Sequence, residues 1–185
     1  MAPALVKQHS ERRALAAELR AQGRRLVGYA AVFDAEARIG EGWVEVIRPG
    51  AFAASLAGGR DVLALVDHDP ARVLGRTRSG TLRLAEDARG LAFEIDVPDT
   101  QDGRDMLALA ERGDLGGMSF GFVAKDQRRQ GDRRELRAVE LHEISVIASF
   151  PAYDGTVVQA RARGEVEPPR LAHARRLLRI AEAFA

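Results

Sequence analysis

The run Gly116-Gly117-Met118-Ser119-Phe120-Gly121-Phe122-Val123 contains the residues that decide the fold. Its part Gly117-x-Ser119-x-Gly121 matches the nucleophile elbow of α/β-hydrolases, in which the serine lies between a strand and a helix. Here the residues after Ser119 continue as the apolar and aromatic residues of a strand, and too little chain follows for the rest of that fold. An esterase of the α/β-hydrolase type is therefore disfavoured, and the run predicts a strand that carries a serine.

Short strands separated by tight turns are predicted around this run. They cover residues 26–33, 43–47, 62–66, 73–77, 82–85, 91–97, 115–123 and 136–147. Turn signals such as Asp69-Pro70 and Ser79-Gly80 separate several of them, and short helices are predicted at 51–56 and 103–111. Closely spaced strands of this kind favour an antiparallel barrel or sandwich over parallel βαβ units. The expected fold class is therefore mainly β with peripheral helices, an α+β arrangement.

Composition divides the chain into three predicted regions. Residues 1–23 are rich in Ala, Arg and Glu and are expected to form an N-terminal arm or weak helix. Residues 24–158 form the folded domain, and residues 159–185 a linker and an amphipathic C-terminal helix. The apolar face of that helix carries Leu171, Ala174, Leu178 and Ala181. We expect this face either to pack on the domain or to dock on another protein.

The overall composition narrows the classes of function. The 185 residues include 28 basic and 27 acidic side chains, and a net charge of +1 gives no reason to expect nucleic-acid binding. The absence of cysteine excludes disulfides and thiolate nucleophiles. No apolar run has membrane-spanning length, and the N-terminus lacks the apolar core of a signal peptide. A soluble, cytoplasmic protein is expected.

Ser119 has candidate partners elsewhere in the chain. A hydroxyl among apolar neighbours costs free energy unless it is hydrogen-bonded. His68, between two aspartates, supplies an imidazole, and the adjacent His142 and Glu143 supply a second imidazole and a carboxylate. These are the groups of an activated serine nucleophile. Neighbouring residues on a strand point to opposite faces, so only one of His142 and Glu143 can face the same site as Ser119.

Simpler interpretations of the same residues stay open at this point. Ser119 alone is more often a small strand residue packed beneath a helix, and His68 alone is more often a hydrogen-bonded turn residue. A metal site could in principle use Asp67, His68, Asp69, His142 and Glu143. No HExxH or comparable helical pair is present, however, so no metal is expected.

Taken together, the segments of this chain resemble the prohead protease family of tailed phages with HK97-type capsids. The resemblance runs in consistent order through residues 28–33, 47–52, 67–70, 73–75, 112–122, 143–147 and 150–153. It covers most of the predicted folded domain and is far more specific than any one string. The compact, Ala- and Arg-rich chain also resembles the members found in bacterial gene transfer agents and prophages.

The resemblance implies a serine endopeptidase related to the herpesvirus assemblins, built on a small antiparallel β-barrel wrapped by helices. It implies Ser119 as the nucleophile and His68 as the general base. The third member is usually an acid on the last long strand, which corresponds to Glu143. In the herpesvirus enzymes it is a histidine, so His142 stays as the alternative. We favour Glu143 because a carboxylate best stabilises the imidazolium that forms during the reaction. The family implies no cofactor.

The family also implies a biological role. The enzyme would cleave scaffold segments from capsid subunits, and itself, inside an immature capsid in the cytoplasm of a bacterial host. Its partners would be the major capsid protein and the scaffold segment of that protein, with no nucleic acid and no membrane; a homo-oligomer is left open. The alternative function is a catalytically silent scaffold or assembly protein that keeps the barrel and binds capsid protein.

Overall fold

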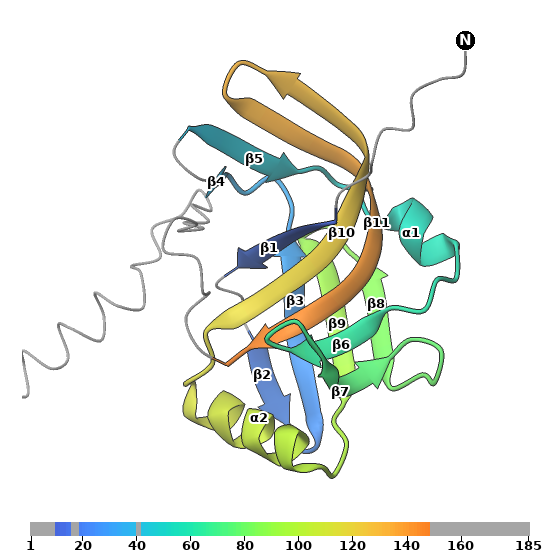
Figure 1. Cartoon of the computed structure of the whole chain (residues 1–185), viewed down its shortest axis with the longest axis vertical. Helices are drawn as coiled ribbons and strands as arrows, with labels where there is room; N and C mark the ends of the chain where they lie inside the picture. Colours follow the sequence, from blue (N-terminus) through green and yellow to red (C-terminus); the bar gives the residue numbers. More distant parts are fainter. Residues whose placement is uncertain (1–9, 16–18, 40–41, 149–185) are drawn as a thin grey trace, which may run out of the picture.

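The computed structural model describes residues 10–15, 19–39 and 42–148. These residues form two β-sheets and two helices, so the prediction of a mainly β protein with peripheral helices is confirmed (Figure 1). The predicted linker and C-terminal helix lie outside the described residues. Neither of the two helices is long and apolar enough to cross a membrane.

A long hairpin dominates the larger sheet, which has seven strands. In order, its main path consists of β1 (Glu11–Leu15), β10 (Gly117–Gln130), β11 (Arg133–Ile147), β5 (Trp43–Ile47) and β4 (Ala37–Ile39). Off this path, β6 (Leu63–Val66) pairs with β11, and β7 (Asp69–Arg76) pairs with β6. Ser119 therefore lies on β10 between the edge strand β1 and the hairpin partner β11.

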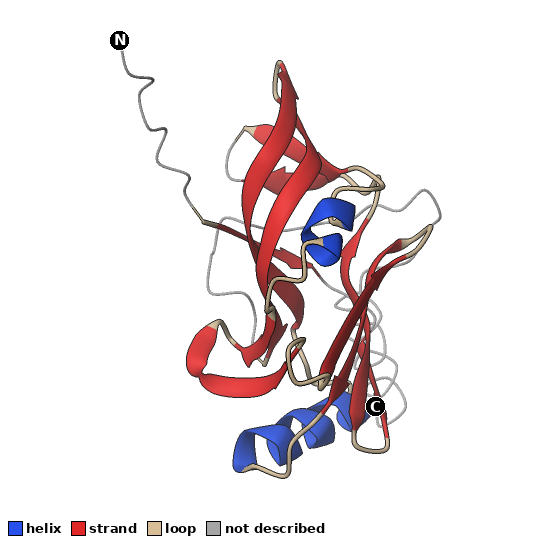
Figure 2. Ribbon diagram, turned by 90° about the vertical axis from the view of Figure 1, so that its right-hand side faces the viewer, coloured by secondary structure: helices blue, strands red, loops and turns tan. Residues whose placement is uncertain are grey.

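The smaller sheet packs against the larger one and closes the core. In order, it consists of β2 (Leu19–Gln22), β3 (Arg25–Val32), β9 (Gly90–Asp96) and β8 (Leu82–Glu86). Figure 2 shows the two sheets as facing layers. Phe120 and Phe122 of β10 point into the layer between them, where they join Leu26, Phe93 and Ile95. Because neighbours on a strand alternate, Ser119 lies on the opposite face of β10 from these phenylalanines.

The two helices cover different parts of the sheets. Helix α2 (Gln101–Arg112) begins at Thr100, whose hydroxyl accepts a hydrogen bond from the Gly103 amide, and buries Met106. It ends at Gly113, which has the left-handed conformation common at helix ends. The short helix α1 (Ala53–Ala57) lies at the side of the molecule, against β11 (Figure 1).

The strand pairing corrects the expectation of purely antiparallel sheets. Strand β11 pairs in parallel with β5 at residues 133–136 and with β6 at residues 143–146, one after the other along the same edge. Between them, the segment around α1 satisfies the free amides of β11: Val139 donates to the Ala51 carbonyl and Leu141 to the Ser55 hydroxyl. The local turn signals missed this pairing because its partners lie about 80 or more residues apart in the chain.

The closed β-barrel is not confirmed. Among the described residues, the hydrogen-bonded ladders form two separate sheets, and no ladder joins one sheet to the other. The core is closed by side chains packed between the layers, as in a sandwich. The fold is therefore mainly β with two facing sheets.

The N-terminal region also differs from its prediction. Residues 11–15 and 19–22, expected within an arm or weak helix, are the strands β1 and β2. Strand β1 pairs with β10 from Glu11 opposite Phe122 to Leu15 opposite Met118. The alternation of this strand is hidden in the sequence because its inward side chains are charged and meet charged partners from distant strands.

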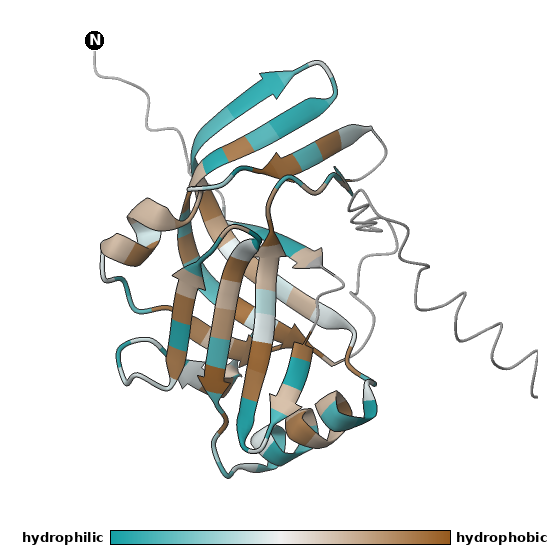
Figure 3. Cartoon of the chain, turned by 180° about the vertical axis from the view of Figure 1, so that it is seen from behind, coloured by the Kyte–Doolittle hydropathy of each residue, from teal (hydrophilic) through white to brown (hydrophobic). Residues whose placement is uncertain are grey.

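The hydropathy of the hairpin changes along its length (Figure 3). Its far end, residues 125–132, is exposed and hydrophilic, and it turns at Gly131. The ends of β10 and β11 nearest Ser119 are buried instead. The part of the hairpin that carries the candidate site is thus anchored in the core.

Candidate active site

His68 lies in a two-residue turn between β6 and β7. Val66 pairs with Asp69, which leaves Asp67 and His68 as the loop, and both have positive φ values, 49° and 61°. Tight hairpins need this backbone conformation, which costs about 1–2 kcal/mol for a residue with a side chain. Asp67 holds the turn in place, because its side chain accepts a hydrogen bond from the Ala148 amide at 2.9 Å.

The His68 ring meets Glu143 across the sheet. Its Nδ1 lies 2.6 Å from Glu143 Oε1, and the two side chains are only 16% and 12% exposed. The other carboxylate oxygen, Oε2, accepts a hydrogen bond of 2.5 Å from the buried Ser145 hydroxyl. The carboxylate is thus fixed from two sides, which orients the imidazole that it contacts.

Gly121 makes room for this carboxylate. It pairs directly with Glu143, and a Cβ atom at position 121 would lie 2.5 Å from Glu143 Oε1 and 3.0 Å from its Cγ. The Glu143 side chain therefore lies over the backbone of β10, two residues from Ser119. The space left by the missing side chain at Gly121 is occupied by the side chain of Glu143.

Ser119 lies on the same face, one register step away. It pairs with Ser145, so the alternation of β10 and β11 places Ser119, Ser145 and Glu143 on one side of the sheet. Ser119 is 1% exposed, and its hydroxyl donates to the backbone carbonyl of Arg13 on β1 at 2.9 Å. The described residues contain no hydrogen bond between this hydroxyl and His68. The structure thus brings the three predicted groups into one patch, with the hydroxyl turned toward β1.

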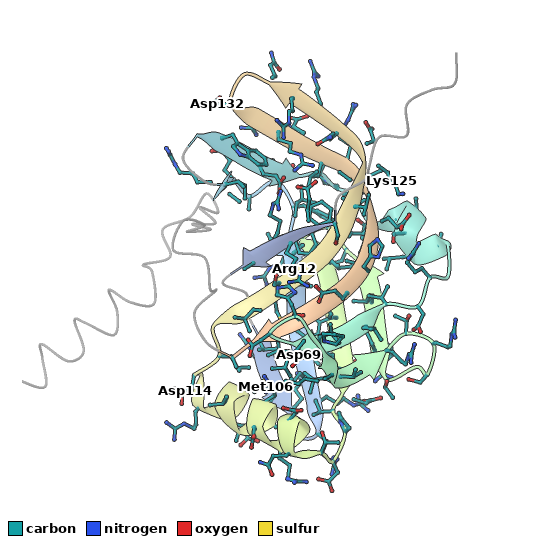
Figure 4. All side chains as sticks on the ribbon, in the orientation of Figure 1. Arg12, Asp69, Met106, Asp114, Lys125 and Asp132 are labelled. Atoms are coloured by element: carbon teal, nitrogen blue, oxygen red, sulfur yellow. The ribbon has the colours of Figure 1, made fainter. Side chains whose placement is uncertain are left out.

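Two residues mark the sides of this patch (Figure 4). Arg12 on β1 lies beyond Gly121, with its Nε 3.8 Å from Glu143 Oε1, and its exposed side chain makes this a weak ion pair. On the other side, Asp69 follows His68 and caps its own turn by accepting from the Ala71 amide. The patch therefore extends from the N-terminal edge strand to the β6–β7 turn.

His142, the alternative third member, contacts a different residue. Its Nε2 lies 3.1 Å from Glu140 Oε1, but the geometry is not that of a hydrogen bond, so this buried nitrogen lacks a hydrogen-bond partner. A hydrogen bond from Lys125 lowers the pKa of Glu140, and nearby Arg60 and His142 lower it further. In this structure the ring of His68 meets Glu143.

The residues that could in principle ligate a metal ion do not gather around one point. Asp67 and Asp69 accept backbone amides, and Glu143 is shared between His68 and Ser145. Within the described part of the chain, no group of three or more His, Asp or Glu side chains could hold a metal ion.

Sequence reasoning missed the roles of Ser145 and of the Arg13 carbonyl. The spacing Glu143-x-Ser145 on one predicted strand would have placed the hydroxyl and the carboxylate on the same face. The contact of Ser119 with Arg13 had no such signal, because it depends on the pairing of β1 with β10.

A carboxylate-bound imidazole beside a buried strand serine is the set of groups that serine hydrolases use. The chain belongs to the caudovirus prohead serine protease family, whose model matches residues 11–168. Its general class is therefore that of the capsid-maturation serine proteases. Comparisons with curated proteins and with solved structures give no significant match. The family match begins at the first residue of β1, so this strand belongs to the family domain.

Proposed function

We propose that this chain cleaves scaffold segments from the subunits of a phage-like capsid, and also cleaves itself, inside the immature capsid in the host cytoplasm. The observation that carries the proposal is the 2.6 Å contact of His68 with Glu143 on the face of the sheet that carries Ser119. The partners are the major capsid protein and its scaffold segment.

The proposed reaction uses these groups in sequence. With Nδ1 held by Glu143, the Nε2 of His68 is the nitrogen that takes the Ser119 proton as Oγ attacks the scissile carbonyl carbon. Glu143 stabilises the resulting imidazolium, which then gives the proton to the leaving amine. Water releases the acyl group from Ser119 by the same route. Backbone amides stabilise the oxyanion, each commonly contributing about 3 kcal/mol.

For this reaction the Ser119 hydroxyl must give up its present hydrogen-bond acceptor and donate to His68 instead. It now donates to the Arg13 carbonyl, and a rotation about the Cα–Cβ bond directs it elsewhere. This observation also favours a second candidate function, a catalytically silent assembly protein that binds capsid protein. In that case Ser119 is a buried strand residue whose hydrogen bond to β1 is permanent.

One experiment separates the two candidates. The full chain and its Ser119→Ala variant are incubated with the cognate capsid protein, and new termini are mapped by mass spectrometry. A protease should lose cleavage by a factor of about 10³ or more in the variant, because the nucleophile and its base act as a unit. Equal cleavage by both chains contradicts the role of Ser119. Absence of cleavage and of fluorophosphonate labelling at Ser119 supports the silent protein.

A further inference from the structure

Strand β1 occupies the edge of β10 directly beside Ser119. Its five residues pair with residues 118–122, and the Arg13 carbonyl accepts the hydrogen bond of the Ser119 hydroxyl. An exposed sheet edge binds an extended peptide by adding it as a further strand. Here the chain fills that edge itself, and the backbone carbonyl nearest the proposed nucleophile belongs to β1.

The side chains of β1 that point away from Ser119 enter a charged clamp. The guanidinium of Arg134 binds both carboxylate oxygens of Glu11, at 2.5 and 2.6 Å. Two residues further along, Arg13 binds both oxygens of Glu45, at 2.5 and 3.0 Å. The Arg134 and Glu45 side chains are only 4% and 2% exposed and are joined to each other at 2.9 Å. The clamp therefore fits an acidic residue followed, two positions later, by a basic one.

This clamp is specific because its own charges are buried. A buried carboxylate or guanidinium that loses its partner is strongly unfavourable, so Glu45 and Arg134 would reject a strand with the charges in the opposite order. The hydrogen bond from Arg134 lowers the pKa of Glu11, which keeps that carboxylate ionised in the bound strand. Alternate side chains thus carry the specificity, while the backbone ladder carries sequence-independent affinity.

Strand β1 also has features that let it detach from the edge of β10. It is a five-residue edge strand held by β10 on one side, and it borders a pocket that Ala31, Ile47 and Phe120 line. A short edge strand beside a pocket opens at a lower free energy than the central hairpin, whose residues are packed in the core.

We propose that β1 is a built-in occupant of the substrate-strand site. An extended segment of the capsid scaffold, with an acidic residue two positions before a basic one, replaces β1 on the edge of β10. Until then, β1 covers Ser119 and engages its hydroxyl. The inference deepens the proposed function and rests on Ser119 as the nucleophile. The competing account is that β1 is a permanent structural strand.

The first experiment measures access to Ser119. The full-length chain, its Glu11→Ala/Arg13→Ala variant and a control variant, Arg83→Ala/Glu94→Ala, react with a fluorophosphonate. The control removes an ion pair of equal charge from β8 and β9, far from β1. Loosening β1 should speed labelling by about tenfold or more, while the control labels like the unaltered chain. Labelling of all three proteins at equal, measurable rates overturns the proposal.

The second experiment measures recognition without catalysis. A fluorescent peptide of residues 9–17, HSERRALAA, is titrated into the Ser119→Ala/Glu11→Ala/Arg13→Ala variant and followed by anisotropy. The control peptide HSRREALAA has the same composition, with positions 11 and 13 exchanged. The first peptide should bind about tenfold or more tightly than the second. Equal binding of the two, or binding of neither, overturns the proposal.

A third measurement needs no variant of β1. In the unaltered chain, hydrogen exchange of the β1 amides should be faster than that of the β10–β11 hairpin near Ser119. Equal protection of the two means that β1 does not open separately, and overturns the proposal. If no protein is labelled by the fluorophosphonate while the peptides are discriminated and β1 opens separately, the strand site stands and the catalytic role of Ser119 fails.

Discussion

A single absent methyl group at Gly121 decides where Glu143 can lie. A Cβ atom there would approach Glu143 Oε1 to 2.5 Å, so Gly121→Ala must push the carboxylate away from its present position. We expect the rate of capsid-protein cleavage to fall by about tenfold or more, because small misplacements of catalytic groups are costly. The melting temperature should fall modestly, since the displaced atoms belong to one side chain, but its buried contacts with His68 and Ser145 are disturbed.

Gly42→Ala is the matched control for this change. A Cβ at Gly42 meets nothing within 4 Å, and this variant should cleave like the unaltered chain. Unchanged cleavage in Gly121→Ala would show that the position of Glu143 over β10 does not matter for the reaction.

The choice between Glu143 and His142 is a second prediction at this scale. Glu143→Gln keeps the shape of the side chain but removes the charge that faces His68 Nδ1. Cleavage should fall by about 10³–10⁴, as expected when the acid that fixes the base is neutralised. His142→Gln should cleave at a rate within about threefold of the unaltered chain, because the ring of His142 contacts Glu140 instead. Measured kcat/KM values in the reverse order would transfer the third role to His142.

At the scale of elements, the β6–β7 turn holds His68 in place through Asp67. Asp67→Ala removes the acceptor of the Ala148 amide and puts alanine at a φ of 49°. Together these changes should lower the free energy of unfolding by about 1–3 kcal/mol, and cleavage should fall with them. Asp67→Asn keeps an acceptor oxygen and tolerates this conformation, so its free energy of unfolding, measured by urea denaturation, should fall less than that of Asp67→Ala. If both variants lose the same free energy of unfolding, the stabilisation comes from the negative charge of Asp67 and not from its acceptor oxygen.

The elements also show how far the sequence leads. Strands β3 and β5 and helix α2 lie within two residues of their predicted bounds, because apolar runs and glycines mark them. Strand β7 begins at Asp69, four residues earlier than predicted, since Asp69-Pro70 forms part of the hairpin. The parallel pairing of β11 and the strand β1 could not be predicted, because both depend on partners far along the chain.

The candidate site also has a part that the sequence predicts and a part that it does not. Ser119, His68 and Glu143 were selected from residue types and from the family resemblance, and the structure brings them to one face of the sheet. The contact of Glu143 with Gly121 and that of Ser119 with Arg13 depend on the registers of β10 with β11 and with β1. Register is set by side chains packed across the whole sheet, so no local motif reveals it.

At the scale of the whole molecule, nearly equal numbers of acidic and basic residues give a net charge of +1. Many of these charges are paired on the surface, where a pair contributes little to stability. The cluster of Glu11, Arg13, Glu45 and Arg134 differs, because it joins β1 to the rest of the sheet and is largely buried. The pKa of Glu11 is lowered in the folded chain, so stability should depend on pH through this cluster.

The sign of that dependence follows from Glu11. The hydrogen bond from Arg134 lowers its pKa in the folded chain below the ordinary value of 4.5. A carboxyl of this kind stabilises the fold above the unfolded pKa, and this stabilisation disappears as the pH falls through the folded pKa. The unaltered chain should therefore be more stable than Glu11→Gln at pH 7, and the difference should shrink from about pH 4.5 downward.

Urea denaturation of both chains across this pH range measures the difference. Glu135→Gln is the control, because a hydrogen bond from Arg48 also lowers the pKa of Glu135, but this pair lies nearer the surface and should give a smaller difference. The difference in free energy of unfolding between the two chains could also stay constant with pH. This result would mean that Glu11 holds β1 by packing and not by its charge. In that case the charge order of the clamp could not be what selects the strand on β10.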